Sequence, residues 1–147
     1  MSKEQRKLVI SNEEVFNILK EGKKAKIKIK GSSMLPFIVG ERDYITLAKV
    51  EDATFRKGRI VVARINENTY FLHRIERIEG EHVVLRGDGN PYLREECPVS
   101  AVLAEAVEIE RKGKRIVLGS PVWNAFRILW PSNPLLRRIF LKIYRIL

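Results

Sequence analysis

A chain of 147 residues with 45% hydrophobic residues has enough material for one domain with one core, and it is too short for a second full domain. The formal charge of +10 favours anionic neighbours, and the single cysteine, Cys97, excludes an internal disulfide. No Cys and His residues stand at metal-ligand spacing, so we expect no metal and no cofactor. The charged N-terminus is followed by an apolar run too short for a secretion signal or an anchor, which favours a cytoplasmic location.

The first predicted element is a short helix over residues 12–21. Ser11 and Glu14 have the spacing of a capping box, and Gly22 supplies a stop. Residues 25–30 then alternate as a half-buried strand does. The pattern therefore changes from helical to extended between residues 21 and 25.

A succession of short apolar segments, separated by turn residues, predicts a mostly β body. The predicted strands cover residues 43–48, 59–65, 69–78, 82–86, 101–110 and 115–118, and residues 111–114 form a hairpin turn between the last two. We expect residues 1–120 to make this β domain.

The composition changes at Pro121. Residues 122–130 and 135–147 are predicted helices, interrupted by residues 131–134, and the segment 121–147 contains five basic residues and no acid. At 100° per residue, the second helix has a basic side with Arg137, Arg138, Lys142 and Arg145 and an apolar side opposite. Two interpretations stay open: docking onto the β body, which buries Phe140 and Tyr144, or peripheral contact with an anionic membrane at its inner face, with Trp123 and Trp130 near the headgroups.

Three segments carry candidate catalytic groups. Ser33 lies in Gly31-Ser32-Ser33-Met34-Leu35-Pro36, His73 lies in a predicted strand, and Asp88 lies in Arg86-Gly87-Asp88-Gly89-Asn90. A serine hydroxyl needs an adjacent base to attack a carbonyl, and a neutral histidine can serve. Gly31 lets the backbone turn sharply, so that the Ser33 hydroxyl and N–H face one space, where the N–H stabilises an oxyanion. Asp88 has two interpretations, a supporting carboxylate or an ordinary turn residue.

In motif order, residues 25–110 resemble the serine peptidase superfamily of type I signal peptidases and self-cleaving repressors of the bacterial DNA-damage response. Ser33-Met34-Leu35-Pro36 resembles its Ser-Met-x-Pro nucleophile box, and the segment from Arg86 to Asn90 resembles its Gly-Asp-Asn box. His73-Arg74-Ile75 resembles the base segment of the endoplasmic-reticulum and archaeal members, which use histidine where bacterial members use lysine. The resemblance implies a coiled-sheet fold, catalysis by Ser33, His73 and Asp88, and substrate contacts by Ser32, Met34 and Pro36.

Some positions depart from the family pattern. Arg59 stands where an acid is usual, Gly31 where many bacterial members have a serine, and Glu95-Glu96-Cys97 where further aspartates are often found. We expect neither the family's usual membrane anchor nor the helix-turn-helix domain that a repressor needs.

The sequence therefore predicts a serine endopeptidase that uses a Ser-His dyad on an extended peptide or precursor protein, which binds along a strand edge. The alternative is a catalytically inactive peptide-binding module, or a membrane-surface adaptor, on the same scaffold. Nucleic acid is not expected as a partner, because the basic run at residues 20–30 has neither interleaved aromatic residues nor a groove-binding helix. The oligomeric state stays open.

Overall fold

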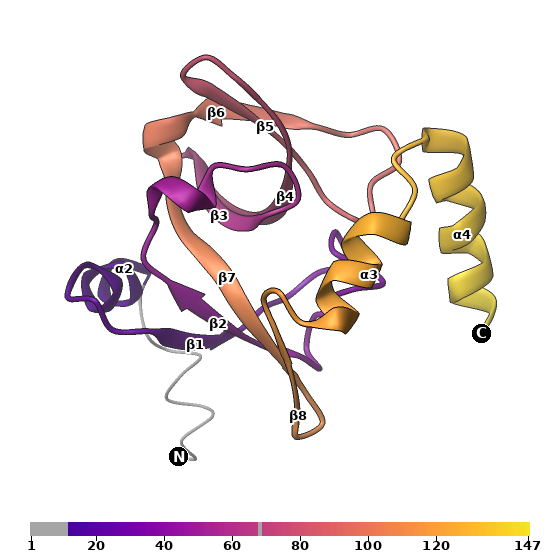
Figure 1. Ribbon diagram of the computed structural model, residues 1–147, viewed down its shortest axis with the longest axis horizontal. Helices are drawn as coiled ribbons and strands as arrows, with labels where there is room; N and C mark the ends of the chain where they lie inside the picture. The colour runs from indigo at the N-terminus through magenta and orange to yellow at the C-terminus, as the bar shows by residue number, and fades with distance from the viewer. Residues whose placement is uncertain (1–11, 68) are drawn as a thin grey trace.

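One antiparallel sheet of eight strands forms the body of the protein in the computed structural model, which describes residues 12–67 and 69–147 (Figure 1). The strands are β1 (Ala25–Lys28), β2 (Tyr44–Ala48), β3 (Ile60–Asn66), β4 (Thr69–Glu79), β5 (His82–Arg86), β6 (Glu95–Pro98), β7 (Val102–Arg111) and β8 (Lys114–Val117). Their order in the sheet is β1-β2-β7-β3-β4-β5-β6, and β8 pairs with β7. The predicted mainly β fold is confirmed.

The sheet has a core on each face, and β3 contributes to both. Ile60 and Val62 pack in the first core, whereas Val61 and Ala63 pack in the second. Successive side chains of a strand point to opposite faces, so a strand that is apolar at four consecutive positions is buried on both sides. Ile45, Leu47 and Ile109 belong to the first core, and Ile75, Val83 and Leu85 to the second.

Helix α2 (Asn12–Lys20) covers part of the first core with Val15 and Leu19, which are 8% and 2% exposed. The predicted helix over residues 12–21 is therefore confirmed to within one residue. Gly22 adopts φ +84° just after the helix, as a left-handed helix stop does. The predicted capping box depends on Ser11, which lies outside the described residues.

The seven predicted strands are all present, with ends that shift by one or two residues. β6 was not predicted from the sequence. This four-residue strand contains two adjacent glutamates and a proline, and it pairs with β5. Two short 3-10 helices, Asp52–Thr54 and Val99–Ala101, were also not predicted. β6 has no alternation of its own, so only its pairing with β5 makes it a strand.

The tail forms helices α3 (Pro121–Leu129) and α4 (Pro134–Ile146). Each begins with proline at its first position, after a cap by Ser120 or Asn133, and this explains why both start one residue earlier than predicted. Trp123 is 1% exposed in the first core, so the expectation that it lies near lipid headgroups is wrong. Across the described part of the chain, no helix has the length and apolar character needed to cross a bilayer.

Candidate active site

The loop that carries Ser33 is anchored in the first core. Gly31 adopts φ +95°, which confirms the predicted sharp turn before the serine. Met34, Phe37 and Ile38 are at most 4% exposed and pack in the core, whereas Ser33 is half-buried. The apolar residues of the loop therefore fix its backbone and leave Ser33 at the surface of the domain.

Asp43 closes the same loop with a buried carboxylate. It accepts hydrogen bonds from the Val39 N–H at 2.8 Å, from Arg42 at 2.7 Å and from Arg111 at 3.3 Å. Burial alone would raise the pKa of Asp43, but the hydrogen bonds from these groups outweigh it and hold the pKa below its usual value. Arg111 also donates to the Phe37 carbonyl, so this cluster ties the serine loop to β7.

His73 is buried in β4, and its Nδ1 atom contacts the Glu95 carboxylate of β6. Strand register explains the pairing. Ile75 of β4 pairs with Leu85 of β5, and Leu85 pairs with Glu95 of β6. His73 lies two residues before Ile75 and therefore on the same face of the sheet as Glu95, two strands away. Phe71 stacks on the imidazole at 5.2 Å between ring centroids. These contacts fix the ring orientation and leave Nε2 as the ring nitrogen that does not face Glu95.

Gly87 lies between the serine loop and the imidazole. A methyl group built at Gly87 would lie 2.3 Å from the Ser33 carbonyl oxygen and 3.2 Å from His73 Cδ2. The sum of these two distances is an upper limit, so the Ser33 carbonyl oxygen lies within about 5.5 Å of His73 Cδ2, the carbon bonded to Nε2. The Gly89 N–H donates to the same Ser33 oxygen at 2.8 Å. The fold thus brings the Ser33 main chain close to the His73 ring, although forty positions separate them in the sequence.

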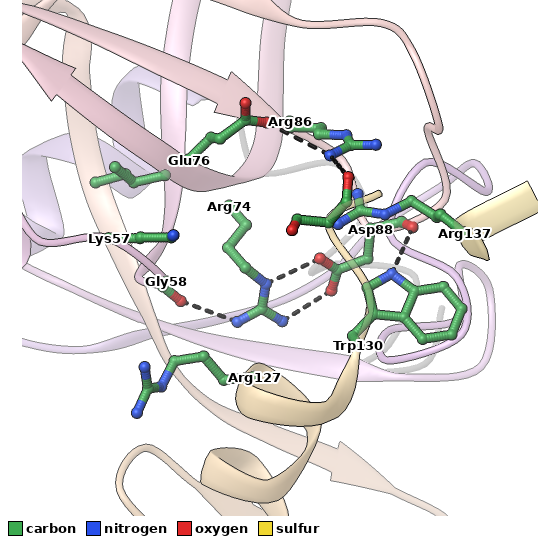
Figure 2. Close-up of a pocket in the computed structure, with 11 residues that line it drawn as sticks. Lys57, Gly58, Arg74, Glu76, Arg86, Asp88, Arg127, Trp130 and Arg137 are labelled. Atoms are coloured by element: carbon green, nitrogen blue, oxygen red, sulfur yellow. Dashed lines mark hydrogen bonds and ion pairs between the residues drawn. The ribbon is translucent and has the colours of Figure 1, made fainter. Parts of the chain in front are cut away.

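The Asp88 carboxylate pairs with the Arg74 guanidinium (Figure 2). Both Asp88 carboxylate oxygens accept from the guanidinium, at 2.9 and 2.8 Å, and the Asp88 carbonyl accepts from Trp130 Nε1 at 2.9 Å. The Arg74 guanidinium also lies over the rings of Phe37 and Phe126, at 5.3 and 5.7 Å. The carboxylate on His73 is therefore that of Glu95, and Asp88 instead fastens the segment that contains Gly87.

A cavity of about 160 Å³ opens beside this ion pair, between β4, β5 and α3 (Figure 2). Two buried arginines close its inner side. Arg86 donates to three main-chain carbonyls, and Arg137 of α4 donates to the carbonyls of Pro131, Gly87 and Asn90. Burial and the nearby charge of Arg86 lower the pKa of Arg137 to about 10, so the Arg137 guanidinium is charged at neutral pH. The cavity is thus positively charged and lies next to the Gly87 segment.

The three predicted substrate contacts differ in exposure. Ser32 is exposed and Pro36 is half-buried, but Met34 is 2% exposed, so its side chain supports the loop from within the core. The unusual Arg59 forms an ion pair with buried Glu105, which also accepts from Thr54. That arginine therefore has a structural role in this chain.

Comparison with known proteins gives one family. A family model for Peptidase S24-like proteins matches residues 2–114, more than half of the chain. The chain belongs to the Peptidase S24-like family. No match was found among curated proteins, and none among solved structures.

The Peptidase S24-like match identifies the β body as a serine peptidase-like domain. The matched residues include Ser33, His73, Asp88 and Glu95, and they end before α3. Helices α3 and α4 therefore lie outside the part of the chain that defines the family.

Glu95 is the site residue that sequence reasoning missed. Glu95-Glu96-Cys97 differs from the family pattern in the sequence. Because no strand was predicted there, the sequence did not place Glu95 next to His73. The segment gives no strand signal, since Cys97 is the one apolar residue of Glu95-Glu96-Cys97. In the fold, Cys97 is buried in the second core and Glu95 shares its side of β6.

Proposed function

We propose that this chain is a serine endopeptidase in which Ser33 is the nucleophile, His73 the general base and Glu95 the carboxylate that orients the base. Two observations support these roles: a methyl group built on Gly87 would meet both the Ser33 carbonyl oxygen and the His73 ring, and Glu95 contacts His73 Nδ1. An imidazole that donates from Nδ1 to a carboxylate keeps Nε2 free to accept a proton. Histidine at the base position also relates the chain to the endoplasmic-reticulum and archaeal signal peptidases.

The proposed reaction has two stages. His73 Nε2 takes the hydroxyl proton of Ser33 as its oxygen attacks the scissile carbonyl, and the imidazolium then protonates the leaving amine. A water molecule, deprotonated by the same nitrogen, releases the acyl group from Ser33. Glu95 stabilises the imidazolium that forms in each stage, at a position where little water reaches it because His73 is 3% exposed.

In this mechanism Asp88 is a positioning residue. Its ion pair with Arg74 and its carbonyl bond to Trp130 hold the segment from Gly87 to Gly89 against the serine loop. Loss of Asp88 is therefore expected to reduce activity by displacing Gly87, not by removing a proton carrier.

The substrate is proposed to bind as an extended peptide along a sheet edge. β1 and β6 are the two ends of the strand order. β1 ends five residues before Ser33 in the chain, and β6 begins at Glu95, so each edge strand is joined closely in sequence to a member of the proposed triad. Main-chain hydrogen bonds to an edge hold a peptide with little dependence on its side chains, which suits an endopeptidase acting on a precursor protein.

Cleavage of a fluorescence-quenched peptide library, with products identified by mass spectrometry, tests the proposal. We expect the wild-type chain and Ser100→Ala, a change at an exposed serine, to cleave the same peptides, and Ser33→Ala to cleave none. Peptide binding without cleavage by the wild-type chain would instead indicate the inactive binding module. Equal cleavage by wild type and Ser33→Ala would refute the proposed nucleophile.

A further inference from the structure

Exposed apolar side chains gather on the two tail helices. Of the fourteen large apolar residues that are exposed in the described chain, ten lie between residues 122 and 147. They are Val122, Ile128, Leu129, Leu135, Leu136, Ile139, Phe140, Ile143, Ile146 and Leu147. Exposed apolar side chains that concentrate in one segment, instead of being scattered singly over the surface, indicate a partner.

Helix α4 docks on the body through a residue of its basic side, Arg137, and through Leu141. Its buried residues are Arg137 and Leu141, at 6% and 3% exposed, while Phe140 is 42% exposed and Tyr144 is half-buried. The predicted docking, with Phe140 and Tyr144 inside, is therefore wrong. Arg137 is held by main-chain carbonyls, including those of Gly87 and Asn90, and these polar bonds fix the helix with its apolar side outward.

The helix consequently has three faces. At 100° per residue, its exposed apolar residues span an arc of about 140°. Arg137 and Leu141 lie on one side of that arc, and three basic residues, Arg138, Lys142 and Arg145, lie on the other. We refer to the ten exposed apolar residues of 122–147, together with these three cations, as the tail surface.

The charge of the tail surface selects between partners. Residues 121–147 contain five basic residues and no acid, and Lys142, Arg145 and Arg127 have no ion-pair partner among the described residues. A second copy of the chain placed on this face would bring two sets of the same cations together. An anionic bilayer instead accepts the apolar arc in its acyl boundary and the cations at its headgroups, where long basic side chains extend toward phosphate.

We propose that α3 and α4 form an in-plane surface that binds an anionic bilayer. Hydrogen bonds that dock the two helices reach the candidate active site: Arg137 donates to the Gly87 carbonyl, and Trp130 donates to the Asp88 carbonyl. Gly87 lies close to Ser33 and His73, since a methyl group built on it would lie 2.3 Å from the Ser33 carbonyl oxygen and 3.2 Å from His73 Cδ2. In Figure 1, α4 is at the outer side of the molecule, opposite α2. The bilayer would thus lie beside the Gly87 segment and far from α2. This inference does not depend on peptidase activity.

Flotation of the full chain with vesicles tests the inference. Two vesicle types are compared, phosphatidylcholine with 30% phosphatidylglycerol and phosphatidylcholine alone, at low and high salt. Removal of the three cations in Arg138→Gln/Lys142→Gln/Arg145→Gln is expected to weaken binding to anionic vesicles on the order of 100-fold. Ile139→Ser/Ile143→Ser, at residues 45% and 50% exposed, is expected to weaken it by about tenfold or more.

A matched control removes three exposed lysines at the opposite side of the molecule, in Lys20→Gln/Lys23→Gln/Lys24→Gln. We expect this variant, and Ser33→Ala, to bind anionic vesicles as the wild-type chain does, and circular dichroism to show that all variants are folded. The inference is overturned if the wild-type chain does not float with anionic vesicles at low salt, or if the lysine control loses as much binding as the tail variant. It is also overturned if sedimentation shows a dimer that Ile139→Ser/Ile143→Ser dissociates while no vesicle binding is seen.

Discussion

Replacement of Gly87 by alanine tests the contact that joins the serine loop to the imidazole. The new methyl group would lie 2.3 Å from the Ser33 carbonyl oxygen, whereas ordinary contacts begin near 3.4 Å. The obstacle is main chain, so the Gly87 segment and the serine loop must separate by about 1 Å. Misplacement of reacting groups by about 1 Å can cost on the order of 10²-fold in rate. We therefore expect Gly87→Ala to lower kcat/KM by roughly 100-fold.

The loss of stability in Gly87→Ala is expected to be modest, about 1–3 kcal/mol, because overpacking at one position is partly relieved by backbone shifts. Gly80→Ala provides the control. Gly80 lies in the β4–β5 turn at φ +60°, with no atom within 4 Å of an added methyl group, so this change strains the backbone by about 1 kcal/mol and leaves the site alone. Peptide cleavage and urea unfolding are measured for both variants. Equal activity of the two folded variants would refute the proposed juxtaposition.

Three further predictions concern Glu95, Asp43 and Arg137. Glu95→Gln is expected to lower kcat about 10²- to 10⁴-fold in a peptide-cleavage assay with little change in KM, because it removes the charge that stabilises the imidazolium of His73. A change confined to KM would contradict this role of Glu95. Asp43→Asn is expected to lower the free energy of unfolding by about 1–3 kcal/mol at pH 7. Because the pKa of Asp43 is lowered in the folded state, this difference in stability should persist down to about pH 4 and vanish as the pH falls further. A stability difference that stays constant from about pH 7 to about pH 2 in urea titrations would contradict this prediction. Arg137→Met is expected to lower the free energy of unfolding by about 2–4 kcal/mol, because main-chain carbonyls lose their donor. The same change is expected to make α4 sensitive to limited proteolysis. Unchanged stability and unchanged resistance to proteolysis would show that other contacts hold α4.

Most of the sheet was predictable because its strands carry their own signals. The segment from His82 to Arg86 contains a short apolar run bounded by turn residues, and its predicted bounds agree with β5. β6 was not predictable in the same way, since Glu95 to Pro98 has neither alternation nor β-branched residues and becomes a strand by pairing with β5. The carboxylate that contacts His73 Nδ1 lies on this strand, so the sequence, which left the role of Asp88 open, did not point to Glu95.

The tail illustrates a second limit of sequence patterns. A helical wheel separates apolar from basic residues in α4, but it does not say which side meets the body. The usual expectation places the apolar side inward. Here a cluster of main-chain carbonyls at Gly87, Asn90 and Pro131 accepts from Arg137, and this polar contact, formed by residues far apart in sequence, turns the apolar side outward.

The central claim is that Ser33 and His73 act as one catalytic unit. It is tested most directly by kcat/KM of the wild-type chain, Ser33→Ala, His73→Gln and the double variant on one cleaved peptide. Residues that act as a unit give non-additive losses. We predict that each single variant and the double variant fall to the same residual rate. Wild-type cleavage by either single variant, or losses that multiply in the double variant, would contradict the claim.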